Sequence, residues 1–499
     1  MSTSRLTTNS RANSARGLVT MLTALATLAL VTILPAATGD TVADQVLGQQ
    51  DFIHLSPNTV DGGSLNAPNF VAVDRPGNHL YLSDTKNNRV LGWRDLATFV
   101  NGEPADLVLG QPDFFSDLAN GNGGPNVGPL TYSSPEGVAV DSNGNLYVAD
   151  TGNNRVLEYN APFSSCAGFP CVGAAPNAIF GQIGNYTSDG CNLGGFTVAA
   201  SADSLCTPQG IAVDAHNNLY VADASNDRVL EFNTPLTTTA VAGSGDTTAD
   251  FVFGQGSAGT DFSDQKCDGG AGVTADFLCN PGAVGVDPSG NVFISDTNNS
   301  RVLEYNEAAT PPANAVPSLV FGQTTFTAGT CSGGSSTNTS LCFPLQLSFD
   351  SSGNLYIADA RDSRVLEYNT PLTTTATPGS GDAAADLPLG VPTVASIGNC
   401  TTGHPVSSST MCSPAGVDLD SNGDVIVADT QDNRVMVFDN PLATDTAADI
   451  VLGQPDFAHI SANSVDPAGV FNPSQTAIDR NSNPQHLYVA DTSNSRVLG

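Results

Sequence analysis

The chain has 499 residues, and its 49 acidic residues outnumber 16 Lys and Arg, which gives a formal net charge of −33. A surface that follows a phosphate backbone needs clustered Lys and Arg. Because this chain lacks such clusters, we expect no nucleic-acid partner, and anionic membranes are poor partners for the same reason.

Residues 1–39 have the pattern of a secretory signal peptide. Arg5, Arg11 and Arg16 precede an apolar run from Gly17 to Leu34, and small residues follow it. A basic start, an apolar centre and a small-residue end are typical of a signal that is removed on export. An uncleaved membrane anchor is the alternative, because the run is long for a signal. No second stretch is long and apolar enough to cross a bilayer, so we expect a secreted, periplasmic or cell-surface protein without a membrane span after cleavage.

Residues 40–499 are dominated by one phrase that recurs seven times. Its cleanest copy, Pro135–Leu157, consists of Pro-Glu-Gly-Val-Ala-Val-Asp, a short turn, and Leu-Tyr-Val-Ala-Asp-Thr-Gly-Asn-Asn-Arg-Val-Leu. A repeat of this kind defines an architecture of stacked, similar units. We therefore predict one repeat domain over residues 40–499.

Each copy of the phrase predicts four short strands. In the second copy they are Gly137–Asp141, Leu146–Asp150, Arg155–Tyr159 and Asn177–Gln182. Short runs of Val, Ile, Tyr and Phe bounded by Gly, Asn and Asp favour strands over helices. The first two runs are almost continuously apolar, which indicates burial on both faces of the sheet. Four-stranded sheets in series meet that condition as propeller blades packed face to face.

The two ends of the repeat region complement each other. The fourth-strand motif also occurs before the first copy, at Ala43–Gln49, and the last copy stops at Gly499 after its third strand. We therefore predict an all-β fold, a seven-bladed β-propeller of four-stranded blades closed by an N-terminal strand that completes the last blade. Closure removes exposed sheet edges. A sequence truncated at Gly499 is the alternative.

The recurring phrase resembles the NHL repeat, and residues 43–499 resemble exported bacterial NHL-repeat β-propellers. The resemblance implies the propeller fold but no single activity. The family includes RNA-binding and protein-binding modules, extracellular domains, and lyases or lactone hydrolases with a metal in the central channel. The units of this chain are longer than is usual in the family, because long loops are added.

The ten cysteines fall into five local pairs. An even number of cysteines at regular positions in an exported chain predicts disulfides. A zinc site is the rival interpretation, but it needs Cys pairs at C-x-x-C-like spacing or His partners, and neither pattern occurs. The predicted pairs are Cys166/Cys171, Cys191/Cys206, Cys267/Cys279, Cys331/Cys342 and Cys400/Cys412.

Every copy ends its second strand with Asp and begins its third with Arg five residues later. A carboxylate that faces a guanidinium group across a hairpin can form a bidentate, charge-assisted pair. Because all blades share the pair, we interpret it as a structural clamp and not as a catalytic set. The pairs are Asp84/Arg89, Asp150/Arg155, Asp223/Arg228, Asp296/Arg301, Asp359/Arg364, Asp429/Arg434 and Asp491/Arg496.

A second series of Asp residues ends the first strands. Asp141-Ser-Asn-Gly-Asn145 resembles the opening of a calcium loop but lacks the later Glu of an EF-hand. Calcium, here or on the axis, is an open alternative without assigned ligands. No Gly-x-Ser-x-Gly motif and no His pair at metal spacing occurs. We therefore name no catalytic residue and expect no cofactor. The series comprises Asp74, Asp141, Asp214, Asp287, Asp350, Asp420 and Asp479.

The connections from each fourth strand to the next first strand vary most between copies. Four of the six complete ones contain a cysteine pair, and long loops on a rigid scaffold are common binding sites. We predict an exported, non-enzymatic monomer that binds an extracellular protein or glycan through these loops. The alternative is an extracellular lyase or lactonase-like hydrolase with a metal ion in the central channel. The connections span residues 112–134, 183–207, 256–280, 324–343, 392–413 and 455–472.

Overall fold

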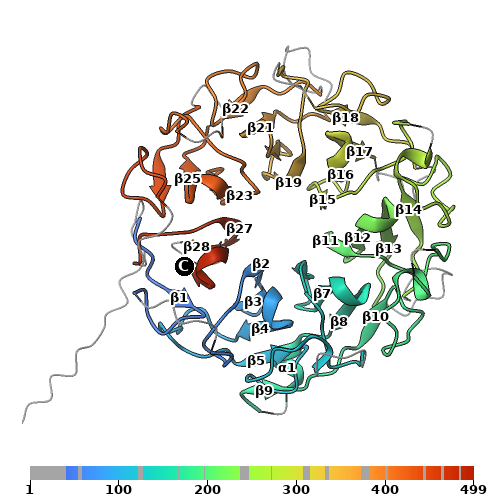
Figure 1. Cartoon of the computed structure of the whole chain (residues 1–499), viewed down its shortest axis with the longest axis vertical. Helices are drawn as coiled ribbons and strands as arrows, with labels where there is room; N and C mark the ends of the chain where they lie inside the picture. The colour runs from blue at the N-terminus through green and yellow to red at the C-terminus, as the bar shows by residue number, and fades with distance from the viewer. Residues whose placement is uncertain are drawn as a thin grey trace, which may run out of the picture.

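Seven antiparallel sheets stand in a ring around a central axis in the computed structural model (Figure 1). Blade 1 contains the first full repeat, and the other blades follow in chain order to blade 7. The predicted signal peptide lies outside the described residues. The structure describes residues 41–53, 59–121, 127–166, 168–195, 197–236, 247–270, 272–306, 315–331, 336–372, 383–398, 400, 403–441, 446–461, 466–480, 482 and 485–499.

The four strands of each blade follow one another from the axis outward. The innermost strands are β2 (Pro68–Asp74), β6 (Val138–Val140), β11 (Pro208–Val213), β15 (Ala283–Val286), β19 (Pro344–Phe349), β23 (Gly416–Leu419) and β27 (Pro473–Asp479). The second strands are β3 (His79–Asp84), β7 (Leu146–Asp150), β12 (Leu219–Asp223), β16 (Val292–Asp296), β20 (Leu355–Asp359), β24 (Val425–Asp429) and β28 (His486–Asp491). The third strands are β4 (Arg89–Trp93), β8 (Arg155–Tyr159), β13 (Arg228–Phe232), β17 (Arg301–Tyr305), β21 (Arg364–Tyr368), β25 (Arg434–Phe438) and β29 (Arg496–Leu498). The outermost strands are β5 (Leu107–Leu109), β10 (Ala178–Phe180), β14 (Phe251–Phe253), β18 (Leu319–Phe321), β22 (Leu387–Leu389), β26 (Ile450–Leu452) and β1 (Val46–Leu47).

The N-terminal strand β1 closes the ring by pairing with β29 of blade 7. Val46 lies opposite Leu498 in an antiparallel register, and the backbone N–H of Gln45 donates to the carbonyl of Gly499 at 2.9 Å. Figure 1 shows the blue β1 on the outer side of the red blade 7. The predicted closure of the propeller is therefore confirmed, and one strand from the start of the chain completes the blade formed by its end.

Blade 1 contains one strand that the repeat did not predict. After β8, the short helix α1 (Pro162–Ser165) leads to β9 (Cys171–Val172), which pairs in parallel with β5 of the preceding blade. The disulfide between Cys166 and Cys171 closes this segment. The outer edge of blade 1 is thereby covered by the chain of blade 2, which protects a strand edge that would otherwise be exposed there.

The hydrophobic core is divided into seven clusters, one at each interface between neighbouring blades. The interface of blades 7 and 1, for example, buries Leu82 and Leu91 of blade 1 against Tyr488 and Val497 of blade 7. Truncation of a buried leucine to alanine in such a cluster costs about 2–5 kcal/mol. The ring is therefore held by seven comparable apolar interfaces and not by one central core.

The innermost strands are less buried than their apolar sequences predicted. All five residues of β7 are buried, whereas Ala139 and Val140 of β6 are only half-buried. The innermost strands pack against neighbouring blades on their sides but face the axis, where no further sheet covers them. Their apolar character therefore lines a channel instead of filling two interfaces, which corrects the expectation that both faces are buried.

The ring has two unlike faces, defined by the turns of each blade. The clamp face carries the turns between second and third strands, together with the long connections between blades. The turn face carries the hairpin turns between first and second strands, such as residues 142–145. Six of the clamp-face turns form short 3-10 helices, followed by a residue with left-handed backbone, such as Asn154 with φ 54°. These are η1 (Thr85–Asn87), η3 (Thr151–Asn153), η5 (Ala224–Asn226), η7 (Thr297–Asn299), η8 (Thr430–Asp432) and η9 (Thr492–Asn494).

Candidate functional site

The predicted Asp–Arg pair is present in every blade, at the clamp face. In each pair Nε of the arginine donates to Oδ2 of the aspartate at 2.6–2.8 Å, and neither side chain is exposed to solvent. The two residues are directly opposite in the register of the second and third strands, as Asp150 and Arg155 show. The bonding differs from the predicted bidentate pair, because only Nε contacts this carboxylate.

The remaining guanidinium nitrogens bind backbone carbonyls of the long connections. Nη1 of Arg155 donates to Tyr186, and Nη2 donates to Gly128 and Thr131, at 2.7–2.9 Å. Each arginine thus joins the loop that enters its blade to the loop that leaves it. Burial raises the pKa of Asp150, although Arg155 opposes that effect. The arrangement is that of a buried, fully hydrogen-bonded structural element, which supports the interpretation as a clamp.

All ten cysteines form disulfides, in the five predicted pairs. Four of these disulfides lie at the clamp face, and the second cysteine of each contacts a clamp directly. The backbone N–H of Cys206, for example, donates to Oδ1 of Asp223 at 2.6 Å. The same contact is made by Cys279, Cys342 and Cys412 at 2.6–2.7 Å. The disulfides therefore fasten the long loops to the most buried polar groups of the ring.

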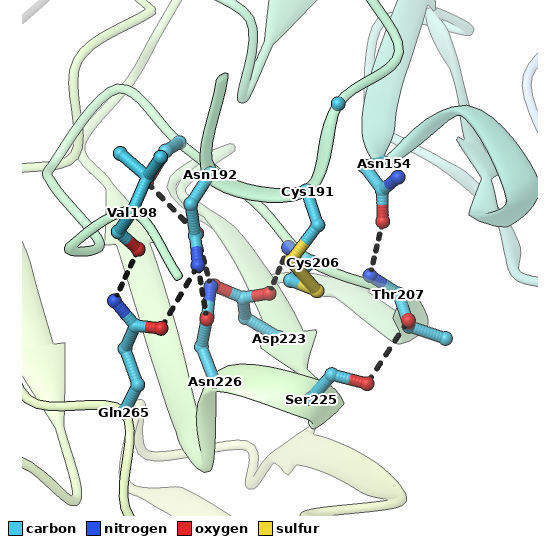
Figure 2. Close-up of a disulfide and its surroundings, with 12 residues drawn as sticks. Asn154, Cys191, Asn192, Val198, Cys206, Thr207, Asp223, Ser225, Asn226 and Gln265 are labelled. Carbon is cyan, nitrogen blue, oxygen red and sulfur yellow. Dashed lines mark hydrogen bonds between the residues drawn. A yellow bond between two sulfur atoms is a disulfide. The ribbon is translucent and has the colours of Figure 1, made fainter. Parts of the chain in front are cut away.

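Neighbouring loops of the clamp face are also hydrogen-bonded to each other (Figure 2). Asn192, next to the disulfide of Cys191, donates to Oδ1 of Asn226 at 2.8 Å and to Oε1 of Gln265 at 3.2 Å. Gln265 belongs to the following loop, and its amide donates to the carbonyl of Val198 at 2.6 Å. The loops of blades 2 to 4 thereby form one connected surface.

Large apolar side chains are exposed on these loops. Among the described residues, six of the eleven exposed large hydrophobic side chains lie in connections of the clamp face. Phe115 is 75% exposed and Ile53 is 66% exposed, and each follows the residue whose carbonyl binds a clamp arginine. An apolar side chain that is exposed on an ordered loop can bury its surface against a partner. The six residues are Ile53, Phe115, Leu118, Ile183, Val198 and Ile397.

The second series of aspartates binds its own hairpin turns. Oδ1 of Asp141 accepts the backbone N–H groups of Asn143 and Asn145, and its Oδ2 accepts the side-chain amide of Asn145, all at 2.8 Å. In blade 1 the partner of Asp74 is His79, whose Nδ1 lies 2.7 Å from Oδ2. These contacts stabilise the hairpin turns.

Two groups of possible metal ligands occur among the described residues, both at the clamp face. One contains Asp268 with Cys267 and Cys279, and the other contains His404, Asp432 and Cys412. Their cysteines are in disulfides and offer no thiolate. The side chain of His404 is only 6% exposed, and its Nε2 lies 3.0 Å from Oδ1 of Asp432. In blade 2 the corresponding contact is a hydrogen bond from Asn153 to Asn120. The His404–Asp432 contact therefore takes the place of a structural hydrogen bond between a loop and a clamp turn.

A cavity of about 610 Å³ lies on the axis, at the turn face. Its lining includes Arg75, Asp418 and Arg480, none of which was singled out from the sequence. The sequence does distinguish the two arginines. Arg75 and Arg480 directly follow the Asp that ends the first strand, whereas the other five blades have Ser, Ala or Pro at that position. Nη2 of Arg480 donates to Oδ1 of Asp418 across two blades at 2.9 Å. Arg75, Asp418 and Arg480 therefore do not belong to the repeated pattern of the blades.

Comparison with known proteins identifies one repeat family. The NHL repeat matches residues 65–93, 132–159, 205–232, 278–305 and 411–438, which lie in blades 1, 2, 3, 4 and 6. No curated protein matches the sequence. Similar solved structures include a streptogramin B lyase, with 9% identity over 89% of this chain and 94% of that chain and a TM-score of 0.47. Virginiamycin B lyase from Staphylococcus aureus has 9% identity over 87% and 94%, with a TM-score of 0.45. Hydrazine synthase from Kuenenia stuttgartiensis has 12% identity over 87% and 96%, with a TM-score of 0.48.

The repeat and the structure agree on the architecture at every level. Five matched repeats coincide with five of the seven blades, and the remaining two blades have the same strand order and the same Asp–Arg pair. The chain is a seven-bladed β-propeller in which five blades match the NHL repeat.

Proposed function

We propose that this protein is an exported, non-enzymatic binding propeller that acts as a monomer and captures a protein or glycan through the loops of its clamp face. The observation that carries the proposal is the exposure of six large apolar side chains on four loops that clamp hydrogen bonds hold in place, two of which also contain a disulfide. Loops that are ordered before contact lose less conformational entropy when a partner binds.

Export is supported by two independent features. Five disulfides indicate an oxidising, extracellular environment, and residues 1–39 have the pattern of a signal peptide. No helix in the described part of the chain has the length and apolar character of a membrane span. N-terminal sequencing of the exported chain tests this part, because cleavage should leave a new terminus near residue 40.

The alternative, a lyase or lactonase-like hydrolase, needs a metal in the central channel. Among the described residues, the side chains that line the axial cavity do not form a cluster of three His, Cys, Asp or Glu ligands. We therefore take binding at the clamp face as the proposed function and metal-dependent chemistry on the axis as its alternative.

The test of the proposed function compares apolar positions in the clamp-face connections with one outside them. Phe115→Ser and Ile53→Ser remove exposed side chains from the clamp face, and Val100→Ser removes one that is 63% exposed between β4 and β5. The immobilised chain is probed with extracellular proteins of its source and with a glycan array. The two clamp-face variants should weaken capture by about fivefold or more, while Val100→Ser should leave it unchanged. Equal capture by all three variants, or no capture by the native chain, would reject the proposal.

Removal of a stapled loop extends this test. Two deletion variants remove one loop each. One lacks the residues between Cys267 and Cys279, the other lacks those between Cys331 and Cys342, and in each the two cysteines are replaced. Both deletions should abolish capture without unfolding the ring. Circular dichroism checks that the sheet content is retained. A folded deletion variant with native capture would exclude that loop from the binding surface.

A further inference from the structure

The seven connections of the clamp face share one exposed position, at which the blades differ in size and polarity. In every blade Nη1 of the clamp arginine donates to a backbone carbonyl of a connection, as Arg89 does to Phe114 at 2.7 Å. The residue after that carbonyl is exposed in all seven blades. It is Ile53 in blade 7 and Phe115 in blade 1, whereas the other five blades have small residues there, namely Thr187, Ser263, Thr327, Ala395 and Ala458.

The large exposed apolar side chains are gathered on one part of the clamp face. We call the three successive connections 50–66, 112–134 and 183–207 the apolar sector, because they contain five of the six such residues on this face among those described. The sixth, Ile397, lies in the connection between blades 5 and 6. Single exposed apolar residues are common on soluble proteins, but these five share three connections that follow one another around the ring (Figure 1). The five residues are Ile53, Phe115, Leu118, Ile183 and Val198.

Hydrogen bonds to the backbone order the apolar sector. The N–H groups of Ile53 and Phe115 each donate to Oδ1 of the aspartate two residues earlier, at 2.9 and 2.8 Å. Nη2 of Arg89 donates to the carbonyl of Asp61 at 3.0 Å while its Nη1 binds the second connection, so one side chain joins the first two connections. Arg155 joins the second and third connections in the same way. Loops that are ordered in advance lose less conformational entropy on contact, so their apolar side chains can act as anchors for a partner.

Negative charge accompanies these apolar side chains. The apolar sector contains no Lys or Arg, and the clamp turn of blade 1 adds a single positive charge, at Lys86. Asp113 and Asp117 are partly exposed in the connection that contains Phe115 and Leu118, and neither belongs to an ion pair among the described residues. Carboxylates without counter-ions attract a cationic partner, and salt screens that attraction. The sector has six aspartates, which are Asp51, Asp61, Asp113, Asp117, Asp189 and Asp203.

We propose that the apolar sector is the primary contact surface of the clamp face, and that it binds a cationic segment of an extracellular protein through several apolar side chains of that segment. Apolar contact supplies most of the affinity, because a few well-packed side chains dominate the energy of an interface. The carboxylates speed the encounter and reject acidic partners. This inference rests on the proposed function, since it locates the binding surface and specifies the chemistry of the partner.

Two other occupants fit the apolar sector less well. A second copy of this chain would bring the same aspartates, and each copy has a formal net charge of −33, so like charges would oppose association. A glycan has no large apolar side chain that could cover Ile53, Phe115 and Leu118, and an acidic glycan would be repelled by the carboxylates. The combination of apolar anchors and negative charge therefore favours a basic protein segment.

The first experiment varies the charge and the apolar content of the partner independently. Four short acetylated peptides of equal length, composed of Lys and Leu, Gln and Leu, Glu and Leu, or Lys and Ala at the same positions, are titrated into the native full chain by isothermal titration calorimetry. The Lys–Leu peptide should bind most tightly, the Gln–Leu and Lys–Ala peptides about fivefold more weakly, and the Glu–Leu peptide least. Equal affinities of the Lys–Leu and Lys–Ala peptides, no binding of the Lys–Leu peptide, or preference for the Glu–Leu peptide would overturn the proposal.

The second experiment replaces residues of the apolar sector by their equivalents in other blades. Phe115→Thr and Ile53→Thr install the residue that blades 2 and 4 have at this position, and each should weaken binding of the Lys–Leu peptide by about fivefold. Thr327→Ala changes the equivalent position of blade 4 and should leave the affinity unchanged. The double variant Asp113→Asn, Asp117→Asn keeps an acceptor for the backbone and should weaken binding of the Lys–Leu peptide alone, not of the Gln–Leu peptide. Native affinity in Phe115→Thr, or equal losses for both peptides in the double variant, would contradict the proposal.

The same variants separate this inference from the proposed function. If Ile397→Thr weakens capture of extracellular proteins more than Phe115→Thr does, the clamp face remains the binding surface but its assignment to the apolar sector is wrong. Capture of a glycan that Phe115→Thr abolishes would likewise keep the proposed function and overturn the basic protein partner. Failure of the native chain to capture any protein or glycan would reject the proposed function, and this inference with it.

Discussion

The clamp face and the turn face of this propeller differ in how closely the blades repeat one another. On the clamp face, each of seven Asp–Arg pairs is buried with the same Nε–Oδ2 contact. On the turn face, Arg75, Asp418 and Arg480 occur once each around the axis. A group that every blade contains can hold the ring together, but it cannot orient a ligand within the ring. Repetition therefore identifies the framework, and departure from repetition identifies the residues that distinguish the axial cavity.

The most severe test of this comparison is the same substitution on the two faces. Arg155→Ala leaves Asp150 as a buried carboxylate without its counter-ion, so we expect a loss of about 3–5 kcal/mol in the free energy of unfolding. Arg480→Ala should cost about 1 kcal/mol or less, because its pair with Asp418 is partly exposed to the cavity. Urea denaturation measures both values, and Arg228→Ala should match Arg155→Ala. Similar losses for Arg155→Ala and Arg480→Ala would remove the distinction between the faces.

Disulfides should also differ between the faces. Cys191 and Cys206 are 15 residues apart and are fastened to a clamp, whereas Cys166 and Cys171 are 5 residues apart near the turn face. Replacement of both cysteines by serine should cost about 2–4 kcal/mol for the first pair and less for the second, because the shorter loop restricts the unfolded chain less. Urea denaturation under non-reducing conditions gives both losses. A larger loss for the Cys166 pair would show that β9 stabilises the ring more than the clamp-face loops do.

Glu158 offers a test through pH on the framework itself. Its side chain is buried in β8, and neither carboxylate oxygen has a hydrogen-bond partner among the described residues. Burial, followed by the charge of Asp141, raises the pKa of Glu158 to about 8, while an unfolded glutamate has a pKa of about 4.3. Between these values the folded state holds a proton that the unfolded state has lost, so stability must fall as pH rises through this window.

Substitution of Glu158 by Gln should remove that loss. At pH 8.5 the variant should be more stable than the native chain by about 1–3 kcal/mol, and at pH 4 the two should be equal. The exposed Glu103→Gln serves as the control and should change stability at neither pH. Equal pH dependence of native and Glu158→Gln unfolding would show that the buried carboxylate is solvated in the folded state.

The reach of sequence reasoning follows the distance over which each contact forms. The Asp150–Arg155 pair and the disulfides lie within one repeat or one loop, so spacing alone predicted them. The meeting of Arg480 with Asp418 depends on the curvature that places blades 6 and 7 side by side, and no local pattern encodes that geometry. The pairing of β9 with β5 likewise joins one blade to its neighbour. The contact between His404 and Asp432 depends on how a disulfide-bonded loop folds back over its blade.

That last contact marks the one described clamp in which a histidine has replaced the usual polar partner. In blade 6, Asp432 takes the place of the Asn found in blades 1 to 4 and 7, and it contacts both His404 and Arg434. Burial raises the pKa of Asp429 to about 7, and Asp432 adds to the increase while Arg434 opposes it. Because the folded pKa exceeds the ordinary value of about 3.9, blade 6 should lose stability as pH rises from about 4 to about 7.

Restoration of the usual residue should reduce this loss. The substitution Asp432→Asn removes the like charge beside Asp429, so the pKa of Asp429 should fall. The change in the free energy of unfolding between pH 5 and pH 8 should then be smaller than in the native chain, with a difference of about 1 kcal/mol or less. Asp362→Asn makes the same change in blade 5, where Asp362 raises the pKa of Asp359, and should act in the same direction. Opposite effects in the two blades would show that His404 already neutralises Asp432, and that even the most regular element of the ring contains one blade with its own charge balance.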